Sequence, residues 1–367
     1  CHILQLSCQE RENSYISVVC DLINKSLDKG DPSQDTLKVL LLGDGPLLPI
    51  AAAKAITDLR QEESERRMRI SVVSLQSSLD ACELANMAVK GRNQEGAIKV
   101  VAVVEKGQTF DGSMTEAVCS AASRELQGGR FDVVLAEPSY HALAVGGAGG
   151  TWAVDEFLRF WQEITALRDN GLLQGSCSIL PCSFSVTARA FECEEMWRRK
   201  QAELEEAEGV KLHKFNEFNP RKGGKGRRSD MSDLAIADSL PWEGSMKFLS
   251  PPQVVTSFSS SSSCEPFEKD ESLTLASQGV CHGVVFSAKI CLTDDDREVF
   301  LPEKILTSEN GYFQALHTFE EPKHVTSGQV LNIRTAISER TSSTDSKAQA
   351  VESLISKYKL LVGFSWS

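Results

Sequence analysis

Several sequence patterns that mark particular classes of protein are missing from these 367 residues. No C-x-x-C pair occurs among the 11 cysteines, so neither a zinc site nor a disulfide framework is predicted, and we expect no metal site. No stretch of about 18 apolar residues is present, so no membrane-spanning helix is predicted. Basic residues are not in excess, and the net charge of -12 argues against a general nucleic-acid-binding surface while it fits basic protein partners.

Length and composition are those of an ordinary globular protein with two domains. The hydrophobic content is 41% and the charged content 25%, both close to the average. The chain begins at Cys1 rather than at Met, so we expect it to be a fragment or processed piece of a longer protein. The scattered cysteines are expected to be buried thiols in a reducing compartment, which points to the cytoplasm, the nucleus or both.

The first half of the chain alternates between apolar runs and segments with helical spacing. A helical N-terminal segment, 1–34, precedes a domain that we place at 35–182. Strands are predicted at 38–42, 70–75, 98–104, 131–136 and 176–181. Helices are predicted at 10–29, 51–60, 79–89 and 157–167. This alternation predicts an α/β domain with a doubly wound parallel sheet.

The second half, 183–367, has the sequence pattern of an all-β domain. A charged, helix-prone stretch at 192–208 comes first, and a basic, glycine-rich run at 220–229 predicts a disordered insert at 219–240. Strands separated by turns are predicted beyond it, at Phe248, 254–256, 283–290, 311–318 and 330–337. The simplest architecture for these strands is a β-barrel or a sandwich.

Two strand ends carry the candidate functional residues. The apolar run 39–42 leads into Gly43-Asp44-Gly45, and the run 131–136 ends on Glu137. A strand, a glycine turn and a later strand with an acid at its tip is the usual construction of a nucleotide-type cofactor site in a doubly wound sheet.

The order of these features resembles that of the protein arginine N-methyltransferases, in which a doubly wound domain precedes a β-barrel. The resemblance is carried by the glycine turn at 39–51, by the Leu135-Ala136-Glu137 strand end and by the stretch 175–181, which resembles the strand preceding the barrel. The stretches 282–286, 311–319 and 327–337 resemble successive barrel strands. The sequence pattern is most similar to that of the second, C-terminal module of the type 7 members, whose chain holds two modules in tandem. The resemblance implies S-adenosylmethionine as the cofactor, the N-terminal module of the same chain as a partner, and Arg-rich protein substrates such as histones or RNA-binding proteins.

Arginine methylation requires two carboxylates that flank the guanidinium and aim one nitrogen at the methyl group. Glu137 matches the first of these carboxylates. The second is expected about ten residues on, but 144–150 contains no acid. Asp155 and Glu156 follow in what is predicted to be the next helix start, and His317 is expected on a barrel face rather than in the site.

The expected cofactor contacts are also incomplete. Gly43 and Gly45 occupy the first two glycine positions, but Leu47 stands where the resemblance implies a third glycine, and we expect its side chain to press on the cofactor space. Asp44 lies inside the turn, where it either faces the pocket or caps its own backbone. Gln76 stands at the strand tip where an acid would bind the ribose hydroxyls, and it lacks the ionised carboxylate.

Three functions therefore remain open at the level of the sequence. The first is a catalytically degenerate module that supports an upstream active one. The second is an active arginine methyltransferase, with Glu137 gripping the substrate and Asp44 and Gln76 on the cofactor. The third is an interaction scaffold that uses 220–229 or 192–208. A nicotinamide-dependent dehydrogenase is the weakest alternative, because the third glycine is missing and the second half is all β.

Overall fold

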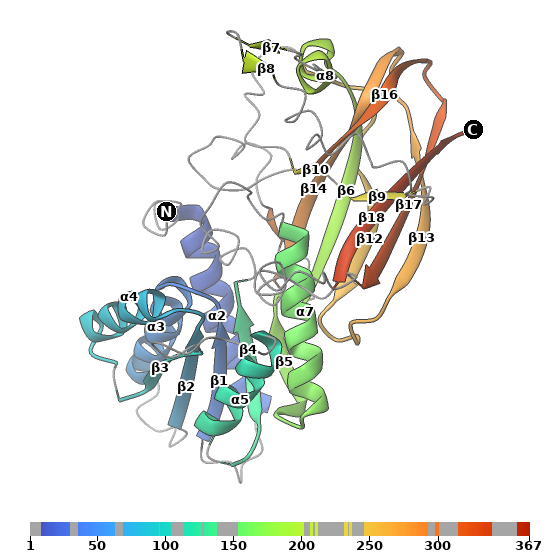
Figure 1. Ribbon diagram of the computed structural model, residues 1–367. Helices are drawn as coiled ribbons and strands as arrows, with labels where there is room; N and C mark the ends of the chain where they lie inside the picture. The colour runs from blue at the N-terminus through green and yellow to red at the C-terminus, as the bar shows by residue number, and fades with distance from the viewer. Residues whose placement is uncertain are drawn as a thin grey trace.

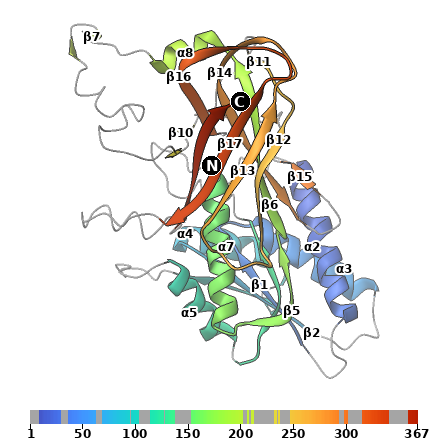
Figure 2. The same cartoon turned by 90° about the vertical axis from the view of Figure 1, so that its right-hand side faces the viewer.

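The computed structural model describes residues 9–29, 36–62, 69–94, 96–103, 114–126, 128–137, 153–201, 206–207, 210–211, 231–233, 235–236, 246–292, 298–300, 315–339 and 358–367. It has a parallel sheet with helices in its first half and antiparallel sheets in its second half (Figures 1 and 2). This arrangement confirms the predicted fold class.

The parallel sheet has the strand order β3-β2-β1-β4-β5. Its strands are β1 (Thr36–Leu42), β2 (Arg69–Gln76), β3 (Ile98–Ala102), β4 (Phe131–Ala136) and β5 (Leu173–Leu180). The helices are α2 (Gln9–Lys29), α3 (Leu47–Glu62), α4 (Leu79–Gly91), α5 (Met114–Leu126) and α7 (Ala153–Asp169). Strand β1 lies at the centre, paired with β2 and β4, and its last four residues are all buried, as expected for a strand covered on both faces.

The described part of the second half has two larger antiparallel sheets and a two-stranded one, β7-β8. One has the order β10-β16-β14-β6-β11, with β12 paired to β6 and β15 to β14, and the other has the order β13-β17-β18-β9. The longer strands are β6 (Ser183–Glu192), β12 (Gln253–Ser259), β13 (Phe267–Thr274), β14 (Gly279–Cys291), β16 (Ala315–Val325), β17 (Val330–Glu339) and β18 (Tyr358–Trp366). The shorter elements are α8 (Glu194–Gln201), β7 (Glu206–Ala207), β8 (Val210–Lys211), β9 (Met231–Asp233), β10 (Ala235–Ile236), β11 (Lys247–Phe248) and β15 (Glu298–Phe300). Buried and less buried residues alternate along β6, as expected for strands with one face toward a barrel core.

Helix α7 ties the two halves together. Its Phe157 ring stacks on Phe184 of β6 with the ring centroids 4.6 Å apart. The Trp161 indole donates a hydrogen bond of 2.7 Å to the Ser262 carbonyl, and Arg168 donates one of 2.8 Å to the Ser260 carbonyl. One cluster of buried apolar residues extends through both halves, so the halves share a core, and a smaller cluster around Phe191 lies in the second half.

Several details differ from the sequence-based expectation. Helix α3 begins at Leu47, four residues earlier than predicted, and α5, β13 and β18 were not predicted at all. Within the insert predicted at 219–240, the described residues form two short strands: β9 pairs with β18 and β10 with β16. The other residues of that insert lie outside the described part of the chain. Among the described residues, no helix is long and apolar enough to span a membrane.

Candidate functional site

Three neighbouring strands bring the predicted site residues together at the carboxyl edge of the parallel sheet. Strand β1 ends at the turn that holds Gly43, Asp44 and Gly45, β2 ends on Gln76, and Glu137 follows β4. The Glu137 amide donates a hydrogen bond of 3.1 Å to the Leu42 carbonyl, which holds the two strand ends side by side. This edge is where ligands bind in open α/β sheets.

The turn requires glycine at both of its glycine positions. Gly43 has φ of 145° and Gly45 has φ of 96°, both in the region that side chains disfavour. A Cβ atom at Gly43 would also lie 3.5 Å from the Glu137 amide nitrogen, so the turn and the β4 tip are in contact. The glycines are thus explained by the backbone alone, with or without a ligand.

Gln76 closes one side of the turn. Its Oε1 accepts a hydrogen bond of 2.7 Å from the Gly45 amide, and its Nε2 donates one of 2.8 Å to the Ser74 hydroxyl. Both Gln76 and Ser74 are fully buried. The Gly45 N–H, a donor of the kind that glycine turns offer to ligands, is therefore bound to the protein's own side chain.

Asp44 closes the other side. Its Oδ1 accepts a hydrogen bond of 2.5 Å from the Ser77 amide, and its Oδ2 accepts one from the Ser77 hydroxyl. The residue is 3% exposed. Asp44 is therefore buried and does more than cap its own turn. Its hydrogen bonds with Ser77 connect the end of β1 to the end of β2.

Leu47 is the first residue of α3 and is buried in the apolar core. The carboxyl edge of the sheet holds a pocket, and Leu47 is not among the described residues that line it. The pocket therefore gives no support to the expectation that the Leu47 side chain presses on the cofactor space.

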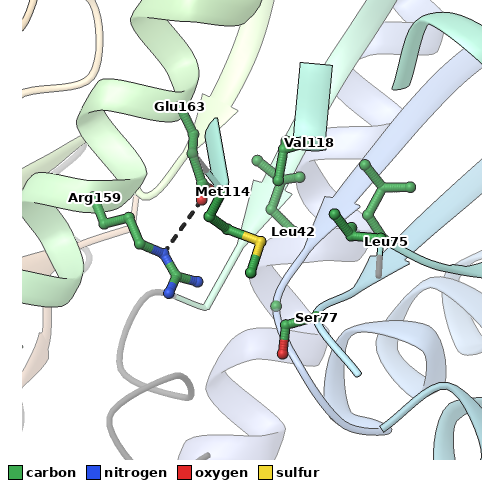
Figure 3. A pocket seen from close by; sticks show the side chains of 9 residues that line it. Leu42, Leu75, Ser77, Met114, Val118, Arg159 and Glu163 are labelled. Atoms are coloured by element: carbon green, nitrogen blue, oxygen red, sulfur yellow. Dashed lines mark ion pairs between the residues drawn. The ribbon is translucent and has the colours of Figure 1, made fainter. Parts of the chain in front are cut away.

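The carboxyl edge holds a pocket with empty space of about 260 Å³, including its open mouth (Figure 3). Described residues from β1, β2, α5 and α7 and the β3 end line it: Leu42, Gly43, Leu75, Ser77, Val103, Met114, Val118, Arg159 and Glu163.

Arg159 and Glu163 were not singled out from the sequence. They lie four residues apart on α7, with the Arg159 Nε 3.3 Å from the Glu163 Oε1, and their side chains are 7% and 4% exposed. The available signal was an Arg and a Glu at helical spacing among the apolar residues of α7. Asp155 and Glu156 fall in the first turn of α7, as predicted, but their side chains are not described. The acid-free segment 144–150 lies outside the described residues.

No other nucleophile or metal site stands out in the described part of the chain. It has no group of three or more potential metal ligands. Burial, with a smaller contribution from the Asp132 charge, raises the pKa of the Cys177 thiol to about 12, so this thiol is not a ready thiolate. His317 lies in β16, with its ring centroid 4.4 Å from that of Phe364, and belongs to the barrel half as expected.

Comparison with known proteins gives one kind of match. No family model matches the chain, and no curated protein does. Among solved structures, the chain is similar to one from the Trypanosoma brucei PRMT1 enzyme–prozyme heterotetrameric complex with AdoHcy, with a TM-score of 0.60 and 14% sequence identity. The match covers 100% of this chain and 93% of that chain, and at this identity it shows the fold.

Proposed function

We propose that this chain is a methyltransferase-fold module of an S-adenosylmethionine-dependent protein arginine N-methyltransferase, and that it supports an active module without binding the cofactor itself. The observation that carries the proposal is the hydrogen bonding of the glycine turn. The Gly45 amide donates a hydrogen bond to the Gln76 side chain, and the Asp44 carboxylate accepts hydrogen bonds from Ser77, so these groups bond to the protein itself.

The residues present do not fit S-adenosylmethionine. Its ribose hydroxyls are best held by an ionised carboxylate at the β2 tip, and Gln76 there is neutral and already bonded at both ends. A cofactor bound here would have to displace the two hydrogen bonds that Asp44 accepts from Ser77 and the one that Gln76 accepts from the Gly45 amide. The buried polar groups of these residues would then lose their hydrogen-bond partners. We therefore derive no catalytic step through the cofactor in this module.

The partner in this proposal is an active methyltransferase module. The sequence resembles the second half of the type 7 enzymes, in which the partner is the N-terminal module of the same chain. The similar Trypanosoma brucei structure is a complex of an enzyme and a prozyme, which is a precedent on the same fold for two kinds of subunit together. Arg-rich proteins would be substrates of the whole assembly, in the cytoplasm or the nucleus, and the net charge of -12 suits such basic substrates.

Independent arginine methyltransferase activity is the second candidate. It is favoured by Glu137, which is 1% exposed at the tip of strand β4, where the first substrate carboxylate would lie. In that function Glu137 would hold the substrate guanidinium.

A methyl-transfer assay separates the two candidates. The purified chain is incubated with radiolabelled S-adenosylmethionine and an Arg-rich peptide, beside its Glu137→Gln variant. The proposal predicts no transfer above background from either protein. Transfer by the chain that is lost in Glu137→Gln would support independent activity and overturn the proposed supporting role.

A further inference from the structure

A buried histidine in the barrel half has no part in the proposed function. His282 of β14 is 4% exposed. The pairing of β14 with β16 is interrupted at this residue. Cys281 pairs with Lys323, and the next paired residue of β14 is Gly283, whose partner is Thr318. An irregular position in a ladder can direct a side chain to a place that a regular pair would not reach.

The His282 ring contacts the start of helix α8. Its Nδ1 accepts a hydrogen bond of 3.2 Å from the Cys193 amide. Cys193 is the residue before α8, and its carbonyl accepts the first hydrogen bond of the helix, 3.1 Å from the Trp197 amide nitrogen. The backbone group that begins α8 is therefore fixed to β14 by one imidazole nitrogen.

Trp197 makes a second contact between α8 and the barrel half. Its ring centroid lies 6.0 Å from that of His282, and its indole donates a hydrogen bond of 2.7 Å to the Phe319 carbonyl of β16. Helix α8 lies at the end of the barrel half that points away from the parallel sheet (Figures 1 and 2). His282 and Phe319 thus hold α8 against two neighbouring strands.

The contact with Cys193 depends on the protonation state of His282. A neutral imidazole has one donor and one acceptor nitrogen, whereas the protonated ring has two donors. Because Nδ1 accepts the Cys193 amide, the ring in this structure is neutral, with its proton on Nε2. A proton on Nδ1 would face the amide N–H, and this buried amide would lose its acceptor.

The ionisable groups around the ring come from several elements. Glu192 ends β6 and Glu194 begins α8, and their negative charges favour the protonated ring, as does bonding of the ring with the Val280 backbone. Burial has the larger effect and lowers the pKa of His282 below its ordinary value of 6.5. The neutral form that the hydrogen bond needs is therefore also the form that the surroundings favour.

The remaining ionisable neighbours are cations and thiols. Lys247 of β11 lies 3.3 Å from the Glu192 carboxylate and offsets part of its charge. Lys323 and His324 of β16 pair with the two residues that precede His282. The Cys193 and Cys281 thiols adjoin the contact in the sequence, and burial raises the pKa of Cys281 to about 11.

We propose that His282 is a pH-dependent hold on helix α8: the neutral ring fixes the start of α8 to β14, and protonation of Nδ1 releases the Cys193 amide and loosens α8 from the barrel half. The direction with pH follows from the chemistry of the ring. An unfolded histidine has a pKa of about 6.5, and the folded value is lower, so the stabilising contribution of the neutral ring is complete above about pH 6.5. It is lost as the pH falls below that value toward the pKa of the folded state.

Hydrogen exchange of the full chain, followed by mass spectrometry, tests the proposal. The readout is the protection of the backbone amides of 193–201, corrected for the intrinsic pH dependence of exchange. Between about pH 7.5 and pH 5, protection in the unaltered chain should fall by roughly fivefold to tenfold, the effect of losing one hydrogen bond. His282→Asn places an amide oxygen near the position of Nδ1 and does not titrate, so its protection should stay constant. His324→Asn, at an exposed position of β16, is the matched control and should behave as the unaltered chain.

Constant protection of 193–201 in the unaltered chain would overturn the proposal. An equal fall in His282→Asn would also overturn it and would assign the pH dependence to another group, such as Glu192 or Glu194. Nitrogen-15 NMR of the His282 ring in the unaltered chain is a second test that needs no variant. Nδ1 must be unprotonated at pH 7.5 and gain its proton over the range in which α8 loses protection, and a ring that is already protonated at pH 7.5 would contradict the proposal.

Discussion

At the scale of single residues, the polar groups of the glycine turn are bound to one another. Gln76 and Asp44 were expected to lie at this turn from their places at strand ends, and the structure puts them there. Their partners could not be predicted, because Gly45 and Ser77 lie more than 30 positions away from them in the sequence and meet them only through the pairing of β1 with β2. Arg159 and Glu163 escaped notice for the same reason, since only the packing of α7 brings them to the pocket.

The hydrogen bond from Gly45 to Gln76 can be tested by its contribution to stability. Gln76→Ala leaves the buried Gly45 amide without its acceptor, and the free energy of unfolding should fall by about 1–3 kcal/mol. Urea denaturation measures the change. Gln253→Ala, at an exposed position of β12, is the matched control and should change it by less than about 0.5 kcal/mol. Equal effects of the two substitutions would mean that the Gln76 side chain does not hold the turn.

The buried thiols predict how stability depends on pH. Burial is the main cause that raises the pKa of Cys177 to about 12 and the pKa values of Cys119 and Cys281 to about 11. An unfolded cysteine has a pKa of about 8.5, so above that pH only the unfolded state releases these protons. Their stabilising contribution is complete below about pH 8.5 and is lost as the pH rises through about 11 to 12.

The urea midpoint should therefore fall between about pH 8 and about pH 10.5, and it should fall less in Cys177→Ala than in the unaltered chain. An equal fall in both proteins would show that the Cys177 thiol ionises as easily in the folded state as in the unfolded one.

At the scale of helices and strands, hydrophobic pattern predicted the elements with long apolar runs and missed those without. Strand β4 was predicted with its observed bounds, because its apolar residues are buried on both faces. Helix α5 was missed because small residues fill much of it and weaken the helical periodicity. Strand β13 was missed because charged residues occupy half of its positions, and five of its eight residues are exposed. Such elements depend on pairing with neighbours that are distant in sequence, here the ladder between β13 and β17.

Helix α7 should be the element whose core residues most affect both halves. Phe157 is fully buried and stacks on Phe184, so Phe157→Ala should lower the free energy of unfolding by about 3–5 kcal/mol. Met87→Ala, on α4 with Met87 71% exposed, is the control and should be nearly neutral. Tryptophan fluorescence and far-UV circular dichroism should report one common transition for Phe157→Ala. Two separate transitions would contradict the shared core.

At the scale of the whole molecule, the fold and the site follow different constraints. A fold needs only apolar residues in the right pattern, and the match over 100% of the chain at 14% identity shows that this architecture tolerates nearly complete replacement of side chains. A cofactor site needs particular polar groups at particular places, and a few substitutions are enough to remove it. The fold was therefore predictable from pattern, whereas the state of the site depends on Gln76, Asp44 and Ser77 individually.

The proposed role of the whole molecule requires that this chain does not bind S-adenosylmethionine. Calorimetric titration of the cofactor into the purified chain tests this requirement most directly. We predict no saturable heat up to about 1 mM cofactor, which corresponds to less than about 4 kcal/mol of binding free energy. Saturable binding with a Kd of about 1 μM would contradict the proposed role, because the cofactor would then have displaced the internal hydrogen bonds of the glycine turn.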